Sequence, residues 1–187
     1  MKKILMLALA ALSVSGGLTG RSATLSAVSL QPADAISSIR QRYAIINRSL
    51  GKYRRVKKEL SGFSTEGGEL VAYFDGKVVM KIATINLGET GRSFEDFYYW
   101  DEKLIFVFRK EDTYTEPFSG KVARSTENRF YFSDGKLIRW IDEKARPVAP
   151  GGSEYREKQN NYLRASARLV ADSRSLKTII EAPADTP

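Results

Sequence analysis

The sequence predicts an α+β fold, in which an antiparallel β-meander of about six strands packs with an N-terminal and a C-terminal helix. Three observations predict it: a hairpin pattern that occurs three times, a helical spacing of apolar residues before it, and a second helical spacing after it. The 187 residues suit one domain, and the 42% apolar and 28% charged shares are ordinary for a globular core.

The first 23 residues have the layout of a secretory signal peptide. Lys2 and Lys3 precede an apolar run from Ile4 to Leu12, and small residues follow it. The run is shorter than the roughly 20 apolar residues that span a bilayer. We therefore expect 1–23 to be removed on export, at a cleavage position that the small residues leave open. The mature protein should then be soluble, in the periplasm or outside the cell; the alternative is an N-terminal helix of the fold.

A first helix is expected from about Ala35 to Leu50. Its apolar residues are three or four positions apart and fall on one helical face: Ile36, Ile39, Tyr43, Ile46, Leu50 and Tyr53. Pro32 stops any earlier helix, and Asp34 is a suitable cap. Because Gly51 follows, the segment 53–60 is either further helix or an extended lead into the sheet.

Three stretches place aromatic residues before an acidic turn, and a lysine with aliphatic residues after it. They are residues 72–79, 98–105 and 131–138. Asp-Gly between two β-prone runs predicts a two-residue hairpin, and the first and third copies contain it. The middle copy has Glu102 in place of glycine, which predicts a longer turn or one of another type.

With their flanking runs, these hairpins predict the strands of the meander. The expected strands are Glu69–Phe74, Val78–Asn86, Ser93–Trp100, Leu104–Lys110, Asn128–Phe132 and Leu137–Ile141, with a short further candidate at Lys121–Ser125.

The second helix is expected from about Ser153 to Asp172, with Ser153 as its cap. Tyr155, Tyr162 and Leu169 repeat every seven residues there. The sequence thus predicts one domain over 35–175 and a disordered tail over 176–187, where two prolines occur.

The order of a short helix, the segment Ser61–Leu70 and Tyr-Phe-Asp-Gly-Lys hairpins that end at Trp140 resembles a group of exported bacterial proteins of unknown function. The resemblance covers about Ile36 to Val148. The individual hairpins are also similar to the aromatic-rich MORN-type repeats and their antitoxin-like relatives, which keep a shorter period and more glycine. The resemblance implies the fold and export, and it brings no catalytic residues.

The absence of histidine and cysteine excludes several chemistries. The chain has no imidazole base, thiolate nucleophile, Cys/His zinc site or disulfide. Neither a calcium loop of the EF-hand type nor a Gly-rich phosphate loop occurs. We therefore expect a protein that is not an enzyme and that has no metal site and no cofactor.

The net charge of +8 arises largely between Ile36 and Leu60, a segment that contains eight Lys and Arg residues and a single acidic residue, Glu59. A basic surface there could bind anionic lipid or lipopolysaccharide. Its candidate residues are Arg40, Arg42, Arg54, Arg55, Lys57 and Lys58. The alternative is a solvated helix face. Export and the lack of interleaved aromatics argue against nucleic acid as a partner.

Consecutive aromatics at 97–100 must occupy both faces of the sheet. If helices cover both faces, these rings are core; if one face is open, rings beside arginines form a recognition surface for a glycan, peptide or protein. The candidate binding residues are Tyr98, Trp100, Arg109, Arg129, Tyr131, Arg139 and Trp140.

Two carboxylate pairs bear on glycan hydrolysis, which needs two carboxyl groups across a sugar ring. Glu95 and Asp96 are strand neighbours and must point to opposite faces. Glu66 and Glu69 flank Gly67-Gly68 and could act together. An exposed turn also commonly carries solvated charged side chains, which is the alternative explanation for this pair.

The leading interpretation is an exported, non-catalytic binding or interaction module of the cell envelope, with ligand and oligomeric state open. The alternatives are the basic-surface binder and the hydrolase.

Overall fold

The computed structural model describes residues 32–183 of the chain. Within this range the chain forms two α-helices, a short 3₁₀ helix and eight β-strands. The helices are α1 (Pro32–Ser49), η1 (Leu50–Lys52) and α2 (Ser153–Arg174). The strands are β1 (Arg54–Ser61), β2 (Gly68–Asp75), β3 (Val78–Gly88), β4 (Gly91–Trp100), β5 (Lys103–Tyr114), β6 (Val122–Ser133), β7 (Lys136–Ile141) and β8 (Ile179–Glu181). The predicted signal peptide at 1–23 lies outside the described residues.

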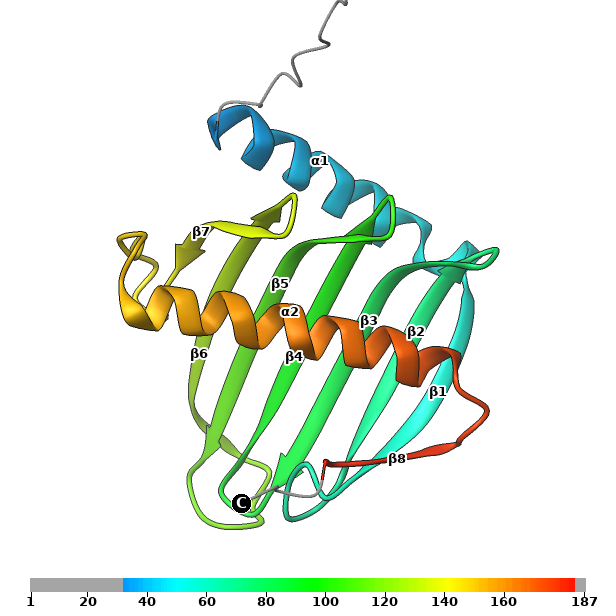
Figure 1. The fold of residues 1–187 in the computed structure, drawn as a ribbon. Helices are drawn as coiled ribbons and strands as arrows, with labels where there is room; N and C mark the ends of the chain where they lie inside the picture. The colour runs from blue at the N-terminus through cyan, green and yellow to red at the C-terminus, as the bar shows by residue number, and fades with distance from the viewer. Residues whose placement is uncertain (1–31, 184–187) are drawn as a thin grey trace, which may run out of the picture.

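All of these strands belong to one sheet, in the order β7-β6-β5-β4-β3-β2-β1-β8. Strands β1 to β7 follow one another as antiparallel neighbours, and β8 returns after α2 to pair parallel with β1 (Figure 1). The predicted α+β class and antiparallel meander are therefore confirmed. Between residues 32 and 183 the sheet is larger than the six strands expected.

The two added strands lie at the β1 edge. The segment 53–60, for which the sequence left helix and strand open, forms β1 and pairs with β2. Strand β8 lies within 176–187, where a disordered tail was expected, and the structure differs from that expectation there. The Glu59 N–H donates to the Thr178 carbonyl oxygen at 2.9 Å, and the Ile180 side chain is 4% exposed. Backbone pairing and apolar burial together hold this strand.

Three element boundaries also differ from the sequence prediction. Helix α1 begins at Pro32 because proline is well tolerated in a first helical turn, where its missing N–H is not needed. Helix α2 begins after Gly152, so Ser153 is its first residue and not its cap. The two strand candidates between Lys121 and Phe132 are joined in the single strand β6.

The three predicted hairpins share a two-residue turn and a β-bulge. The turns are Gly76-Lys77, Asp101-Glu102 and Asp134-Gly135. The third residue after each turn is the extra one, and these residues are Met80, Ile105 and Ile138. The expectation of a different turn at Glu102 is wrong: Asp101 and Glu102 have φ values of 48° and 59°, both positive like those of Asp134 and Gly135. All three bulge residues pack beneath α1.

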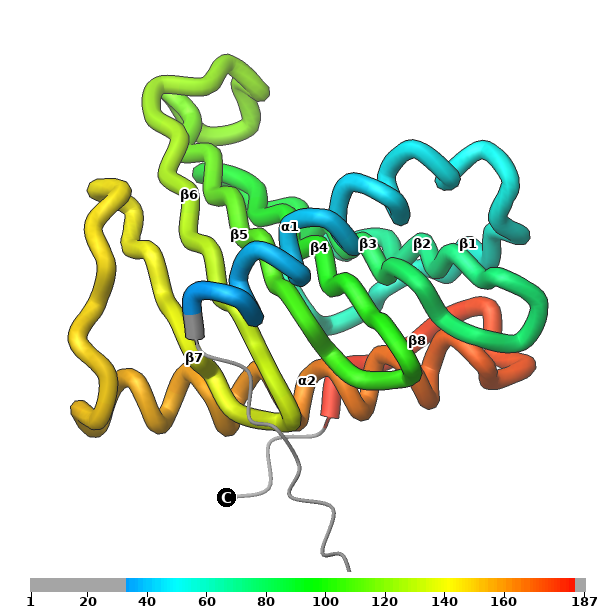
Figure 2. The backbone as a smooth tube through the Cα atoms, turned by 90° about the horizontal axis from the view of Figure 1, so that it is seen from above, coloured from blue at the N-terminus to red at the C-terminus, as the bar shows by residue number. Residues whose placement is uncertain are grey.

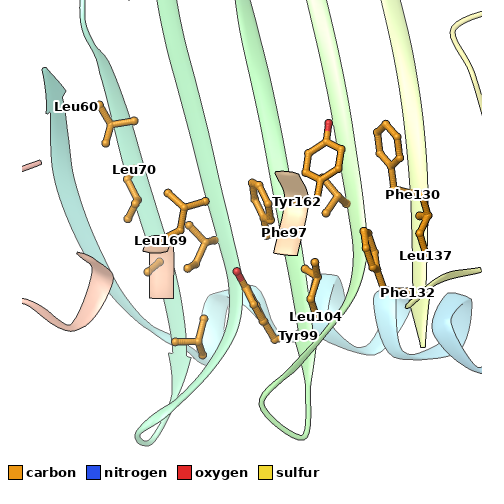
Figure 3. Packing of buried hydrophobic residues seen from close by; sticks show 14 of the residues in the cluster. Leu60, Leu70, Phe97, Tyr99, Leu104, Phe130, Phe132, Leu137, Tyr162 and Leu169 are labelled. Carbon is orange, nitrogen blue, oxygen red and sulfur yellow. The ribbon is translucent and has the colours of Figure 1, made fainter. Parts of the chain in front are cut away.

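The two helices lie on opposite faces of the sheet (Figure 2). Helix α2 crosses from β7 to β1: the Tyr155 hydroxyl donates to the Leu137 carbonyl oxygen at 3.1 Å, and Lys58 reaches the far end of the helix. The larger apolar cluster lies beneath it, with aromatic rings from β4 and β6 against Tyr162 (Figure 3). The smaller cluster lies beneath α1, around Ile39, Ile46 and Tyr98.

Candidate functional site

On the α1 face, directly opposed residues of neighbouring strands form rows across the sheet. The row beneath α1 is Tyr73, Lys81, Tyr98, Phe106 and Tyr131. The next row away from the hairpin turns is Val71, Ala83, Asp96, Phe108 and Arg129. The third is Glu69, Ile85, Phe94, Lys110 and Glu127. Because α1 lies across the end of the sheet that carries these turns (Figure 1), the second and third rows border the helix or lie beyond it.

A cavity of about 300 Å³ opens where α1 meets this uncovered part of the face. Helix α1 supplies Ile39, Arg40 and Tyr43, and strands β5 and β6 supply the opposite wall. Those strand residues are Phe106, Phe108, Glu127, Arg129 and Tyr131. The Tyr43 and Phe106 rings meet edge to face at 5.5 Å. The walls are thus mainly ring carbons, with guanidinium groups of Arg40 and Arg129 among them.

A second, shallow hollow of about 420 Å³ continues this cavity across the sheet. Phe108 lines both hollows. From there, an apolar strip extends over β4, β3 and β2, and its residues are Phe94, Ile85, Ala83 and Val71. We call the cavity and this strip together the α1 groove. Since strands lie about 4.8 Å apart, the strip from β5 to β2 is about 14 Å long.

Most charges along the α1 groove are paired. The Arg129 guanidinium lies 2.5 Å from Glu127 Oε2, and Lys81 Nζ lies 2.8 Å from Asp96 Oδ2. Lys110 Nζ lies 3.0 Å from Asp112 Oδ1. Arg129 and Lys110 also lie over the rings of Phe108 and Phe94, each at 5.6 Å. These cations therefore cover the edges of the strip, and each of them is bonded to a carboxylate.

Arg40 differs from these paired cations. Its side chain is exposed at the mouth of the cavity. Among residues 32–183 it makes no ion pair. A positive charge therefore stands, without a neutralising partner in the described structure, beside an apolar groove.

The seven predicted binding residues divide between the two faces. Arg129 and Tyr131 line the α1 groove, and Arg139 lies opposite Tyr131 on the same face. Arg109 and Trp140 are on the α2 face, where the Trp140 Nε1–H donates to Asn128 Oδ1 at 3.0 Å. The sequence could not separate them, because it did not show the register that assigns each strand residue to a face.

Tyr98 and Trp100 are on the α1 face but are covered. Tyr98 is 1% exposed, and its hydroxyl lies 3.2 Å from Asn47 Oδ1 and 3.3 Å from Asp96 Oδ2. Burial and the Asp96 carboxylate raise the pKa of Tyr98, so its phenol stays protonated. Trp100 packs with the α1 cluster, with the Arg42 guanidinium 5.3 Å from its ring. Both residues serve the helix–sheet contact.

The structure does not bring the six predicted basic residues together on one surface. In β1 their side chains alternate, so Arg54 and Lys58 are on the α2 face, whereas Arg55 and Lys57 are on the α1 face. Lys57 is paired with Glu69. Lys58 is 4% exposed, and its ammonium donates to the Ser175 carbonyl oxygen at 2.8 Å and to that of Lys177. It thus holds the segment that follows the C-terminal end of α2. Arg40 and Arg42 remain on α1.

The two carboxylate pairs also separate. Glu95 and Asp96 do point to opposite faces, as strand alternation requires: Glu95 contacts Tyr162 of α2, and Asp96 contacts Tyr98 beneath α1. Glu66 is exposed on a loop, and Glu69 is paired with Lys57 on β1. Nothing in the described contacts joins Glu66 to Glu69.

The binding residues predicted from the sequence do not include the apolar part of the α1 groove, namely Ile39, Tyr43, Phe94 and Phe108. The signal was present in the strand alternation, because Phe94, Asp96 and Tyr98 share one face and Phe106 and Phe108 share it too. Strand alternation does not show that α1 covers only one end of that face.

Two broader features can be stated for residues 32–183. None of the helices there is both long and apolar enough to cross a membrane. No group of three or more acidic side chains there is placed to hold a metal ion. In comparisons with known proteins, no family model matches the chain, and neither a curated protein nor a solved structure matches it significantly.

Proposed function

We propose that the protein is an exported, non-catalytic binding module of the cell envelope, and that its ligand is a single-chain amphipathic carboxylate held in the α1 groove. The observation that carries this proposal is an apolar groove, open along the sheet, with Arg40 at the mouth of its cavity and without an ion-pair partner among residues 32–183.

The apolar strip supports a chain-like ligand. Its apolar residues extend from Tyr43 and Phe108 to Phe94 and Val71, about 14 Å from β5 to β2, with charged residues beside them. A single acyl chain would cover these ring and methyl carbons. Each Å² of apolar surface so removed from water stabilises the complex by about 25 cal/mol.

The charges support an anionic head group. Arg129 is paired with Glu127, and Lys110 shares Asp112 with Arg92, whereas Arg40 makes no ion pair among residues 32–183. A guanidinium binds a carboxylate through two parallel hydrogen bonds, which also fixes the orientation of the ligand. The head group would therefore lie beside α1 and the chain would extend towards β2.

The composition supports a role by contact. The full chain has neither histidine nor cysteine, which are the commonest acid–base and nucleophilic side chains near neutral pH. The signal-peptide pattern at 1–23 supports export, which would expose the protein to envelope lipids and their degradation products.

Calorimetric titration with dodecanoate, below its micelle-forming concentration, tests the proposal. We expect saturable binding, about tenfold weaker in Phe108→Ala and several-fold weaker in Arg40→Gln, because these changes remove the apolar floor and the head-group charge. Arg164→Gln, an exposed change on α2, should bind like the wild type.

Two further ligands separate this function from its alternatives. Dodecyltrimethylammonium has the same chain and the opposite charge, and it should not bind. Anionic phospholipid vesicles test the basic-surface alternative. Salt-sensitive attachment to vesicles without dodecanoate binding would replace our proposal with that alternative, and equal binding of both detergents would contradict the role of Arg40.

A further inference from the structure

A polar cleft lies on the opposite face of the sheet, beyond α2. Its volume is about 660 Å³. It lies at the strand ends farthest from the three bulged hairpins, and the small residues Gly91 and Ser93 are among those that line it. The polar residues of β3, β4, β5 and β6 that line it include Asn86, Ser93, Glu95, Arg109, Glu111, Thr113, Arg124 and Thr126.

The deepest groups of this cleft are held in place by one another. Glu95 Oε1 accepts hydrogen bonds from Arg109 Nη1 at 3.0 Å and from the Tyr162 hydroxyl at 3.4 Å. The second amino group of Arg109 lies 2.5 Å from Glu111 Oε1. Burial raises the pKa of Glu95, while the charge and hydrogen bond of Arg109 act in the opposite direction. Side chains fixed in this way lose little freedom when a ligand binds.

The charged side chains of the cleft are bonded to one another. Arg109 is bonded to both Glu95 and Glu111, and Arg124 lies 3.5 Å from Glu143 at the rim. An anionic ligand would have to displace carboxylates, and a cationic ligand would have to displace arginines. The site is suited to a neutral ligand that both donates and accepts hydrogen bonds.

Two features indicate that the ligand of this cleft carries hydroxyl groups on a compact carbon skeleton. Asn86 Oδ1 is buried and has no hydrogen-bond partner among the described residues, so this amide is not satisfied by the fold alone. Phe63 forms part of the wall and offers ring carbons to C–H groups; the Arg168 guanidinium lies 4.9 Å from the ring and holds it in position. Sugars combine such hydroxyls with such C–H faces.

We infer that this cleft is a second binding site, for a neutral saccharide. Its hydroxyl groups would bond to Asn86, Glu111 and Thr126, and a pyranose face would pack on Phe63. The site shares no lining residue with the α1 groove. It therefore stands independently of the fatty-carboxylate ligand proposed above.

Titration of ¹⁵N-labelled protein with cellotriose, chitotriose and maltotriose, each to millimolar concentration, tests this inference. We expect at least one of these neutral trisaccharides to produce saturable shifts of the amide signals around Asn86, Ser93 and Thr126. Asn86→Ala and Thr126→Val should each weaken that binding about tenfold, because each removes a hydroxyl-bonding group.

Asn160→Ala, an exposed change on α2, is the matched control and should bind like the wild type. Phe108→Ala should keep trisaccharide binding, which separates this site from the α1 groove. If Asn86→Ala fails to fold, Thr126→Val alone carries the test. Absence of cleft shifts with all three sugars, shifts confined to other surfaces, or unchanged affinity in a folded cleft variant would overturn the inference.

Discussion

Neighbouring basic residues of β1 have opposite surroundings. Lys57 is exposed on the α1 face, whereas Lys58 is buried on the α2 face and donates to carbonyl oxygens at the end of α2. Ser175 directly follows the last residue of α2, and Lys177 lies two residues further on. The ammonium of Lys58 therefore satisfies backbone carbonyls of the segment that follows α2, and the count of basic residues in this segment overstates the charge available to a ligand.

Replacing Lys58 by methionine should lower the free energy of unfolding by about 1–3 kcal/mol, because it leaves buried carbonyl groups without their donor. Lys57→Met removes an exposed lysine paired with Glu69 and should cost less than about 1 kcal/mol. Urea unfolding of both variants measures the difference. Equal stabilities would show that Lys58 has no structural role.

Asp112 is a second buried charge with fixed partners, on the α1 face. Hydrogen bonds from Ser125, Lys110 and Arg92 lower its pKa from 3.8 to about 2. A lowered pKa in the folded state means that this group stabilises the fold above pH 3.8 and that its contribution is lost as the pH falls towards 2. Asp112→Asn should therefore be less stable than the wild type at neutral pH, with the gap narrowing over that interval.

Thermal unfolding at a series of pH values measures this gap. Asp75→Asn, at an exposed position beside the first hairpin turn, is the control and should show a small and nearly constant difference. A gap between Asp112→Asn and wild type that widens on acidification would contradict the assignment.

For individual residues, the sequence predicted which side-chain types occur at a binding surface better than it predicted the face of the sheet on which each residue lies. Arg129 and Tyr131 were singled out as an arginine beside a ring, and both line the α1 groove. Trp140 was singled out for the same reason and is 6% exposed on the other face. A shift of one residue exchanges the faces, and the bulges that set this register have no distinct sequence signal.

The repeated element is a bulged hairpin. The geometry of its turn overrides the conformational preference of the residues that occupy the turn. Glu102 has φ 59°, a region in which a side chain costs about 1–2 kcal/mol, yet its turn keeps the two-residue length of the others. The strands on both sides are long and paired, and their twist favours a turn of this type. The sequence therefore predicted the three hairpins correctly, but two of their turns differ from the prediction. The first turn is Gly76-Lys77 and not Asp75-Gly76, since Asp75 pairs with Val78, and in the middle turn pairing overrides the residue's own preference.

Glu102→Gly should raise the free energy of unfolding by about 1 kcal/mol, because glycine adopts a positive φ without steric cost. The change also removes an exposed ion pair with Arg174, at 3.5 Å, which contributes little. The reciprocal change Gly135→Glu, at φ 74° with open space around it, should destabilise by a similar amount. Denaturant midpoints of the two variants should move in opposite directions. Movement in the same direction would contradict the strain argument.

At the scale of the molecule, each helix leaves part of its own sheet face uncovered. Helix α1 covers the end near the hairpin turns and leaves an apolar strip with charged residues at its edges. Helix α2 leaves a polar cleft at the far ends of the strands. The sequence predicted both helices and the meander. It could not show how far each helix reaches, because helix placement depends on bulges, register and the closing strand β8 together.

The most direct measurement for the binding role is a ¹⁵N chemical-shift titration of the wild-type protein with dodecanoate. We predict saturable shifts at α1 around Ile39 and Tyr43 and at β5 around Phe106 and Phe108, with the polar cleft signals unchanged. No saturable shift, or shifts that avoid these residues, would contradict the account.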